Sequence, residues 1–338
     1  MGSAIANALA KLAEGQPLDA ALAESVMDEV MGGQATSAQI GAILMALRMR
    51  GESAAEISGF ARSMRRHAVP VAVARRPLLD TCGTGGDGSH SFNISTVAAL
   101  VVAGAGVTVA KHGNRSATSK AGSADLLEAL GVALSPEATV LSRMIDEAGF
   151  GFLFAQSVHT AMRHVAPARR ELGVRTVFNL LGPLTNPLQP EYQLIGIFDA
   201  ARLKLMAEAL ADLGVDHGVV VHGDGLDEVT VSGVTQWARV DRGQLSFGTW
   251  TPEELGVSRY PKSALVGGDA EKNAILCREV LSGENGPYRE VVLANAAVAL
   301  WAARAVDDPR SGVKLAAESI DSGRAEAVLN RIRELSTS

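Results

Sequence analysis

Apolar residues in the first 70 positions recur with the 3.6-residue period of amphipathic helices. Two pairs, Thr36 with Gln39 and Ser53 with Glu56, have the spacing of capping boxes and mark the starts of two helices. We therefore expect this part of the chain to form a small helical bundle that serves as a scaffold or a dimer contact. The period is clearest at Leu18, Leu22, Ser25, Val26 and Val30.

Beyond residue 78, short apolar runs typical of strands alternate with helical patterns, which indicates an α/β fold with a central, mostly parallel sheet. Residues 158–188 interrupt this alternation with helical and turn signals, and we expect them to return to the helical bundle. The expected domains are a small helical one, 1–72 plus about 158–188, and a large α/β one, about 73–157 plus 189–338. The expected strands are 78–81, 107–110, 150–154, 193–198 and 219–222, and the helices include 124–130, 201–213 and one that begins at Pro136.

Charge and cysteine content narrow the classes of function. The 338-residue chain has a formal net charge of −6, which gives no general attraction to nucleic acid or to anionic membranes. The basic residues between Arg62 and Pro77 have no aromatic residues interleaved for base stacking, so we expect a solvated hinge there. Cys82 and Cys277 stand in no metal or disulfide pattern and no targeting signal is visible, which favours a cytoplasmic protein.

Three loops that follow or precede predicted elements carry donors suited to an anion. Residues 80–88 follow a strand, and their glycines allow backbone N–H groups to turn inward around a phosphate, although a tight turn explains the glycines equally well. Residues 91–96 open an apolar helix, whose N-terminus favours negative charge. Residues 111–119 follow another strand with two cations and several hydroxyls, in which His112 either contacts a ligand or packs the loop.

Two further features suggest a metal and a carboxylate partner. Asp227 and Glu228 lie on an irregular loop after a strand, where both carboxylates can reach one Mg²⁺ and its waters. A bare Asp-Glu pair is usually solvated surface, and only the three anion loops make a magnesium polyphosphate ligand attractive. Arg169 and Arg170 could each bind a substrate carboxylate, and residue type alone does not separate them.

Taken together, these motifs resemble the anthranilate phosphoribosyltransferase family of tryptophan biosynthesis. The resemblance runs nearly end to end, as far as the late segments Gly267–Ala270 and Asn295–Ala297. Five motifs in order make it specific, because each of them alone is modest. They are Gly83–Asp87, Asn93–Thr96, Lys111–Arg115, Phe178–Pro187 and Asp227–Glu228.

The resemblance implies a homodimer with a small helical domain and a larger α/β domain of the nucleoside-phosphorylase-like type. It implies transfer of the phosphoribosyl group of phosphoribosyl pyrophosphate (PRPP) to the amine of anthranilate, with Mg²⁺. By matching position, Gly83, Asn114 and Arg169 would contact anthranilate, and Ser95, Asp227 and Glu228 would bind Mg²⁺. PRPP would be held by Gly83, Gly86, Asp87, Ser91, Asn93, Ile94, Ser95, Thr96, Lys111, His112, Gly113, Asn114, Arg115, Ser116, Ala117, Thr118, Ser119 and Ser123.

The chemistry implied by this reaction asks mainly for electrostatic stabilisation of the leaving pyrophosphate, for which Lys111 and His112 are candidates. No residue is assigned as a general base, since the aryl amine of anthranilate is already unprotonated near neutral pH. Two other functions remain open at this point. A pyrimidine nucleoside phosphorylase would leave Asp227 and Glu228 without a purpose, and a nucleic-acid-binding relative without transferase activity fits poorly with the negative net charge.

Overall fold

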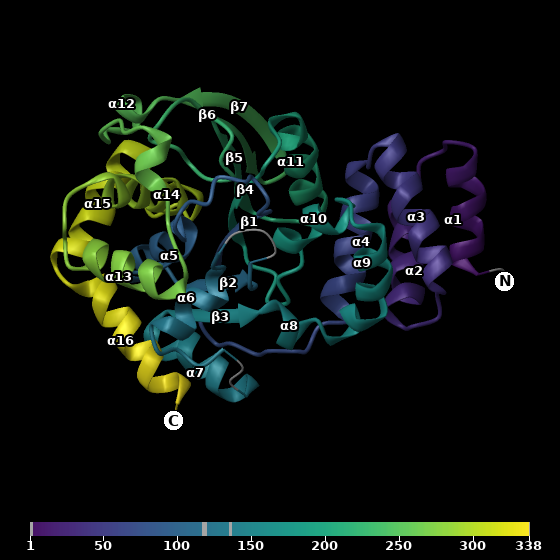
Figure 1. Cartoon of the computed structure of the whole chain (residues 1–338), viewed down its shortest axis with the longest axis horizontal. Coiled ribbons are helices and arrows are strands. Elements are labelled where there is room, and N and C mark those ends of the chain that lie inside the picture. Colours follow the sequence, from purple (N-terminus) through teal and green to yellow (C-terminus); the bar gives the residue numbers. More distant parts are fainter. Residues whose placement is uncertain (1–2, 117–119, 135–136, 338) are drawn as a thin grey trace.

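The N-terminal helices form a bundle at one side of the molecule (Figure 1), as expected. The computed structural model describes residues 3–116, 120–134 and 137–337. Both predicted capping boxes are present, at Thr36 with Gln39 and at Ser53 with Glu56, because each hydroxyl accepts a hydrogen bond from the amide three residues on. The helices of the bundle are α1 (Ala4–Ala13), α2 (Ala20–Met31), α3 (Ser37–Arg50) and α4 (Ala54–Arg66).

A seven-stranded sheet in the order β3-β2-β1-β4-β5-β6-β7 forms the centre of the larger lobe. Strands β1 to β5 pair in parallel, whereas β6 and β7 add an antiparallel hairpin that the sequence analysis missed. Arg242 and Gly243 link this hairpin with φ values of 47° and 81°, the left-handed pair that a tight hairpin turn requires. The strands are β1 (Leu79–Gly83), β2 (Val109–Gly113), β3 (Phe150–Phe154), β4 (Tyr192–Gly196), β5 (His217–Gly223), β6 (Thr235–Asp241) and β7 (Gln244–Trp250).

Helices cover both faces of the sheet, because alternate residues of its strands point to opposite sides. Val219 and Val221 belong to the apolar cluster formed with α5 and the C-terminal helices, whereas Val220 belongs to the cluster shared by α11 and the N-terminal bundle. The sheet is therefore buried from both sides. The covering helices are α5 (Ile94–Gly104), α6 (Ser123–Ala129), α7 (Ala138–Ala148), α11 (Leu203–Asp212), α13 (Ala270–Leu281), α14 (Pro287–Ala302), α15 (Pro309–Asp321) and α16 (Arg324–Ser336).

The segment after β3 crosses back to the bundle (Figure 1), where α9 contacts α3 and α10 contacts α4. Val165, Ala168 and Phe178 from this segment share an apolar cluster with Ile57 and Phe60 of α4. These contacts support the division into residues 1–72 plus 158–188 and 73–157 plus 189–338, which stays a prediction. The short elements are α8 (Ala155–Val158), η1 (Thr160–His164), α9 (Ala166–Leu172), α10 (Phe178–Leu181), η2 (Gly182–Leu184), η3 (Ala200–Arg202), α12 (Pro252–Leu255) and η4 (Lys262–Leu265).

The basic stretch between Arg62 and Pro77 is less solvated than we expected. Arg65 is only 9% exposed, and its Nε donates a hydrogen bond to the Leu184 carbonyl at 2.8 Å. Burial lowers the pKa of this guanidinium to about 10. Part of the supposed hinge is thus a packed contact between the bundle and the segment around η2.

Three smaller expectations can be compared with the described residues. Both Cys82 and Cys277 carry free thiols. Pro136, where we expected a helix to begin, lies outside the described residues, and the helix there is seen from Ala138. Within the part of the chain that the structure describes, no helix is both long and apolar enough to cross a membrane.

Candidate active site

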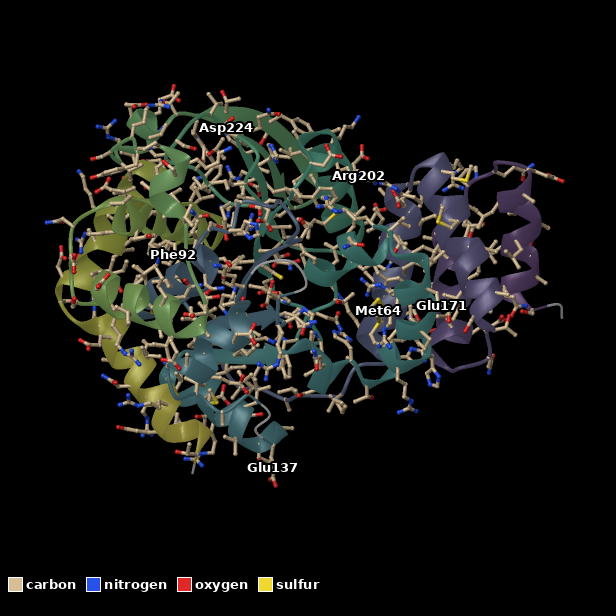
Figure 2. All side chains as sticks on the ribbon, viewed as in Figure 1. Met64, Phe92, Glu137, Glu171, Arg202 and Asp224 are labelled. Carbon is tan, nitrogen blue, oxygen red and sulfur yellow. The ribbon has the colours of Figure 1, made fainter. Side chains whose placement is uncertain are left out.

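A cavity of about 530 Å³ opens where the loops after β1, β2 and β5 meet the helical segments. Its far wall comes from Met64 of α4, Met162 of η1 and Phe178 of α10. In Figure 2, Met64 lies on the side of the bundle that faces the sheet, and Phe92 lies within the α/β lobe. Sixteen predicted site residues line this one cavity: Gly83, Gly86, Asp87, Ser91, Asn93, Ser95, Lys111, His112, Gly113, Asn114, Arg115, Ser116, Ser123, Arg169, Asp227 and Glu228.

The glycine-rich loop after β1 is held between an anion and a cation. Gly85 and Gly86 have φ values of 67° and 77°, which glycine adopts without the strain that a side chain would add. The Gly85 N–H donates to Asp227 Oδ2 at 2.7 Å, so this inward-facing amide already serves a negative oxygen. Arg175 donates to the Gly86 carbonyl, and its guanidinium carbon lies 4.2 Å from the centre of the Phe198 ring.

In the second predicted anion loop, residues 91–96 at the start of α5, some side chains line the cavity and others lie in the protein core. The Ser95 N–H donates to Glu228 Oε1 at 3.2 Å, which places the helix N-terminus next to a carboxylate. Asn93 Nδ2 donates to the Ala121 carbonyl at 3.1 Å and thereby joins this loop to the one after β2. Ile94 and Thr96 are 1% and 0% exposed, so their side chains lie in the core rather than on the cavity wall.

The loop after β2 contributes a buried ammonium group. Lys111 is 1% exposed, and its Nζ donates to the Thr81 carbonyl and, at 3.3 Å, to Ser95 Oγ. The cation therefore lies beneath the helix N-terminus and close to the acidic loop. The predicted residues Ala117, Thr118 and Ser119 lie outside the described residues.

Arg115, from the same loop, has its guanidinium carbon 5.6 Å from the centre of the Phe154 ring at the end of β3 and pairs with two carboxylates of α6. It donates to Asp125 Oδ1 at 2.6 Å and to Glu128 Oε1 at 2.9 Å, and both acceptors belong to α6. Since Arg115 is exposed, these ion pairs add little to stability but hold the loop against the helix.

Two buried histidines, His112 and His159, meet edge to face with their ring centres 5.0 Å apart. His112 Nδ1 lies 3.1 Å from the Gly182 carbonyl, which can only accept, so the proton is assigned to Nδ1. Burial lowers the pKa of His112 to about 3 and that of His159 to about 4, and both rings are neutral at physiological pH. Their buried Nε2 atoms have no hydrogen-bond partner among the described residues and are available as acceptors.

The acidic loop after β5 rests on the ends of the strands. A side-chain carbon at Gly196, the last residue of β4, would lie 1.6 Å from the Asp227 carbonyl oxygen, and one at Gly83 would lie 2.3 Å from Asp227 Oδ2. Only glycine at these strand ends lets the loop approach so closely. Burial raises the pKa of both Asp227 and Glu228, and the charges of Asp87 on Asp227 and of Asp227 on Glu228 add to the increase.

These acidic residues fit Mg²⁺ by the chemistry of their donors. Asp227 and Glu228 are half-buried carboxylates with raised pKa values, and a divalent cation would compensate their charge. Ser95 supplies a hydroxyl next to Glu228. In residues 3–116, 120–134 and 137–337, no three His, Cys, Asp or Glu side chains form a metal cluster.

The two adjacent arginines of α9 are placed differently. Arg169 lines the cavity, and its guanidinium carbon lies 5.1 Å from the centre of the Phe178 ring. Burial lowers its pKa, and no charged neighbour contributes to the shift. Arg170 is exposed and does not line the cavity. Arg169 is therefore the arginine placed to receive an anion.

Several lining residues had no predicted site role. Most come from helical segments, where an apolar or aromatic side chain looks like ordinary core until the bundle meets the sheet. Phe178 and Asn179 belong to a motif that carried the resemblance, but no function was assigned to them. The residues missed in this way are Met64, His159, Met162, Arg175, Phe178 and Asn179.

Comparison with known proteins agrees with this architecture. Residues 75–326 match the family described as "Glycosyl transferase family, a/b domain", and residues 6–68 match its helical bundle domain. The chain is 54% identical over 327 residues to the anthranilate phosphoribosyltransferase of Symbiobacterium thermophilum, and 96% of each chain is covered. The crystal structure of anthranilate phosphoribosyltransferase from Thermus thermophilus has a TM-score of 0.93 at 48% identity, over 98% of this chain and 99% of that one.

The fold and the cavity thus define a glycosyl transferase with a helical bundle and an α/β domain. A structure of anthranilate phosphoribosyltransferase from Saccharomyces cerevisiae, in complex with PRPP and Mg, has a TM-score of 0.90 at 27% identity. The match covers 100% of this chain and 99% of that one. The chain belongs to the anthranilate phosphoribosyltransferases, enzymes of tryptophan biosynthesis. The predicted fold class and family are confirmed.

Proposed function

We propose that this enzyme joins anthranilate to PRPP in the cavity at the strand ends, giving N-(5-phosphoribosyl)anthranilate and pyrophosphate. This reaction is the second step of tryptophan biosynthesis from chorismate, and we place it in the cytoplasm with Mg²⁺ as cofactor. The observation that carries the proposal is the convergence of three features in one cavity. They are the glycine-rich loop, the Asp227–Glu228 pair and the half-buried Arg169.

The sheet side of the cavity is suited to the pyrophosphate of PRPP. The positive end of the α5 dipole lies at this side of the cavity, where negative charge grows as pyrophosphate leaves. Mg²⁺ held by Ser95, Asp227 and Glu228 would neutralise part of that charge. Buried Lys111 adds a positive charge beside the acidic loop and Ser95.

The helical side of the cavity is suited to anthranilate. Its apolar wall, with Met64, Met162 and Phe178, matches an aromatic ring, and Arg169 can pair with the carboxylate in two parallel hydrogen bonds. Gly83 and Asn114 line the same cavity, nearer the sheet. The ring would thus lie between the bundle and the PRPP site.

No general base is needed for attack by the aryl amine, because that amine is neutral near pH 7. A pKa of about 3 makes His112 a poor proton acceptor, whereas its neutral ring can accept a hydrogen bond at Nε2. Catalysis then depends on positioning the two substrates and on stabilising the charge of the leaving group. The amine proton leaves after bond formation, to solvent or to pyrophosphate.

The test is the loss of anthranilate fluorescence with time. We expect the loss to require enzyme, PRPP and Mg²⁺ together, and to stop when EDTA is added. A steady signal from folded protein under these conditions would overturn the proposal.

We also propose that two copies of the chain form a homodimer through the helical bundle. Met49 near the end of α3 is 83% exposed, a large apolar side chain that a second copy would cover. Size-exclusion chromatography with light scattering should give twice the 35.1 kDa chain mass, and Met49→Glu should shift it toward the single-chain mass. A single-chain mass for the native protein would refute the dimer.

A further inference from the structure

Asn295, on helix α14, holds the chain directly after the acidic loop. The side chain is 1% exposed. Its Oδ1 accepts the Val229 N–H at 2.9 Å, and its Nδ2 donates to the Val229 carbonyl at 2.8 Å. A third bond joins Nδ2 to the Val291 carbonyl, one turn earlier in the helix, at 2.8 Å. One amide thus satisfies both main-chain groups of Val229 and is itself anchored to α14.

This double contact is expected to fix the position of Glu228, since Val229 is the next residue and is fully buried. A small cavity of about 10 Å³ behind the site is lined by Ser95, Glu228 and Asn295, which places the amide close to two proposed metal ligands. There is little free space into which the loop could relax. Leaving the Val229 amide and carbonyl without partners would carry the cost of buried unsatisfied polar groups.

We propose that Asn295 is a positioning residue that sets the geometry of Glu228 for Mg²⁺. The inference rests on the proposed role of Glu228 as a metal ligand. Groups that orient metal ligands without touching the metal commonly change affinity by about 10- to 100-fold when removed. Asn295 lies on a C-terminal helix, 67 positions after Glu228, and no motif of metal chemistry includes it.

The test measures metal binding directly, with the full-length protein and no turnover. Mn²⁺ is titrated in the presence of pyrophosphate and followed by electron paramagnetic resonance, in the native enzyme, Glu228→Gln, Asn295→Ala and Asn295→Ser. The serine hydroxyl can still bond to the Val291 carbonyl, which preserves the helix, but it is too short to serve Val229. We expect both Asn295 variants to weaken Mn²⁺ binding by about tenfold.

Two controls separate positioning from a general loss of packing. Leu300→Ala removes a fully buried side chain from the same helix and should lower Tm without changing Mn²⁺ affinity. Asn273→Ala removes another buried amide, which donates to Asn93 Oδ1 at 2.9 Å rather than to the acidic loop, and should raise KM for PRPP with Mn²⁺ affinity intact.

The outcomes are distinct. Unchanged Mn²⁺ affinity in both Asn295 variants, with a loss in Glu228→Gln, would overturn the role of Asn295 and leave the metal site standing. Equal losses of Mn²⁺ affinity in Asn295→Ala and Leu300→Ala would show that the effect comes from helix packing, which would also overturn the role of Asn295. If Glu228→Gln binds Mn²⁺ normally, the proposed metal site fails, and the positioning role falls with it.

Discussion

At the scale of single residues, burial decides which charged groups can act on a ligand. Arg169 and Arg170 are chemically identical neighbours, yet only Arg169 lines the cavity. Asp227 and Glu228 would be ordinary on a surface, whereas on the cavity wall partial burial makes their negative charge costly and raises both pKa values. The same side chains gain or lose a function according to what surrounds them.

Replacing Arg169 with Ala should impair the use of anthranilate much more than that of PRPP. A hydrogen-bonded charge pair contributes about 1.5–3 kcal/mol, so KM for anthranilate should rise about 10- to 100-fold. Steady-state kinetics with each substrate varied in turn measure the two effects, and Arg170→Ala is the matched control. Equal increases in both Michaelis constants would count against the assignment.

The variants Asp227→Asn and Glu228→Gln should each raise the Mg²⁺ concentration that gives half-maximal activity. Removing one carboxylate of a pair leaves Mg²⁺ with fewer charged ligands, and we expect a shift of about tenfold or more. Asp224→Asn, in the same loop but with its side chain 56% exposed, should leave the titration unchanged. An unaltered titration in the first two variants would remove these residues from the metal site.

At the scale of elements, the ends of the strands pack directly against the loop that carries Asp227 and Glu228. The acidic loop follows β5, but the Asp227 main chain lies against Gly196 at the end of β4, and the Asp227 carboxylate lies against Gly83 at the end of β1. Asn295 on α14 holds the loop from the other side. Three elements that are far apart in sequence therefore share the task of placing two carboxylates.

Gly196→Ala should displace this loop, because its new methyl group would lie 1.6 Å from the Asp227 carbonyl oxygen. We expect a loss of about 1–3 kcal/mol in the free energy of unfolding and a weakened response to Mg²⁺. Urea denaturation and a Mg²⁺ titration of activity measure the two effects.

Gly41→Ala is the control for this substitution, since nothing lies within 4 Å of a side-chain carbon there. Because Gly41 lies inside a helix, the alanine variant should gain roughly 0.5–1 kcal/mol in the free energy of unfolding. Native stability and native Mg²⁺ response in Gly196→Ala would show that the loop does not depend on this contact.

At the scale of the whole molecule, the boundary between the bundle and the sheet holds buried ionisable groups whose effects on stability oppose each other. His112 and His159 have lowered pKa values, so the unfolded chain binds protons below pH 6.5 that the folded chain does not. The free energy of unfolding therefore decreases as the pH falls from 6.5 toward 4, because the unfolded chain gains these protons first. Asp80, whose pKa burial raises to about 6, stabilises the fold over part of the same range as it becomes protonated.

His159→Gln should therefore make the protein less sensitive to acid. The pKa of His159 falls from 6.5 to about 4 on folding. The stability difference between native enzyme and variant should thus change by about 2 kcal/mol between about pH 7 and about pH 4.5. Urea denaturation at both pH values measures this, with the exposed His90→Gln as control. A constant difference would show that the buried ring binds a proton in the folded protein.

The sequence by itself determined the parts of this protein that depend on local pattern. Neighbouring residues suffice to predict the capping boxes at Thr36 and Ser53, the alternation of strands and helices, and the glycine-rich and hydroxyl-rich loops. The family follows from the order of these motifs. The hairpin of β6 and β7 was missed, although its turn residues Arg242 and Gly243 are adjacent.

Tertiary structure alone decided which of these residues meet. The family resemblance had already pointed to Arg169 rather than Arg170, but only the structure turned Arg115 toward α6 and sent the side chains of Ile94 and Thr96 into the core. The structure also brought Asn295 to the acidic loop and Met64 to the cavity wall. The physical reason is that burial and hydrogen bonding between distant segments depend on how the bundle, sheet and C-terminal helices pack, and no local pattern contains that information.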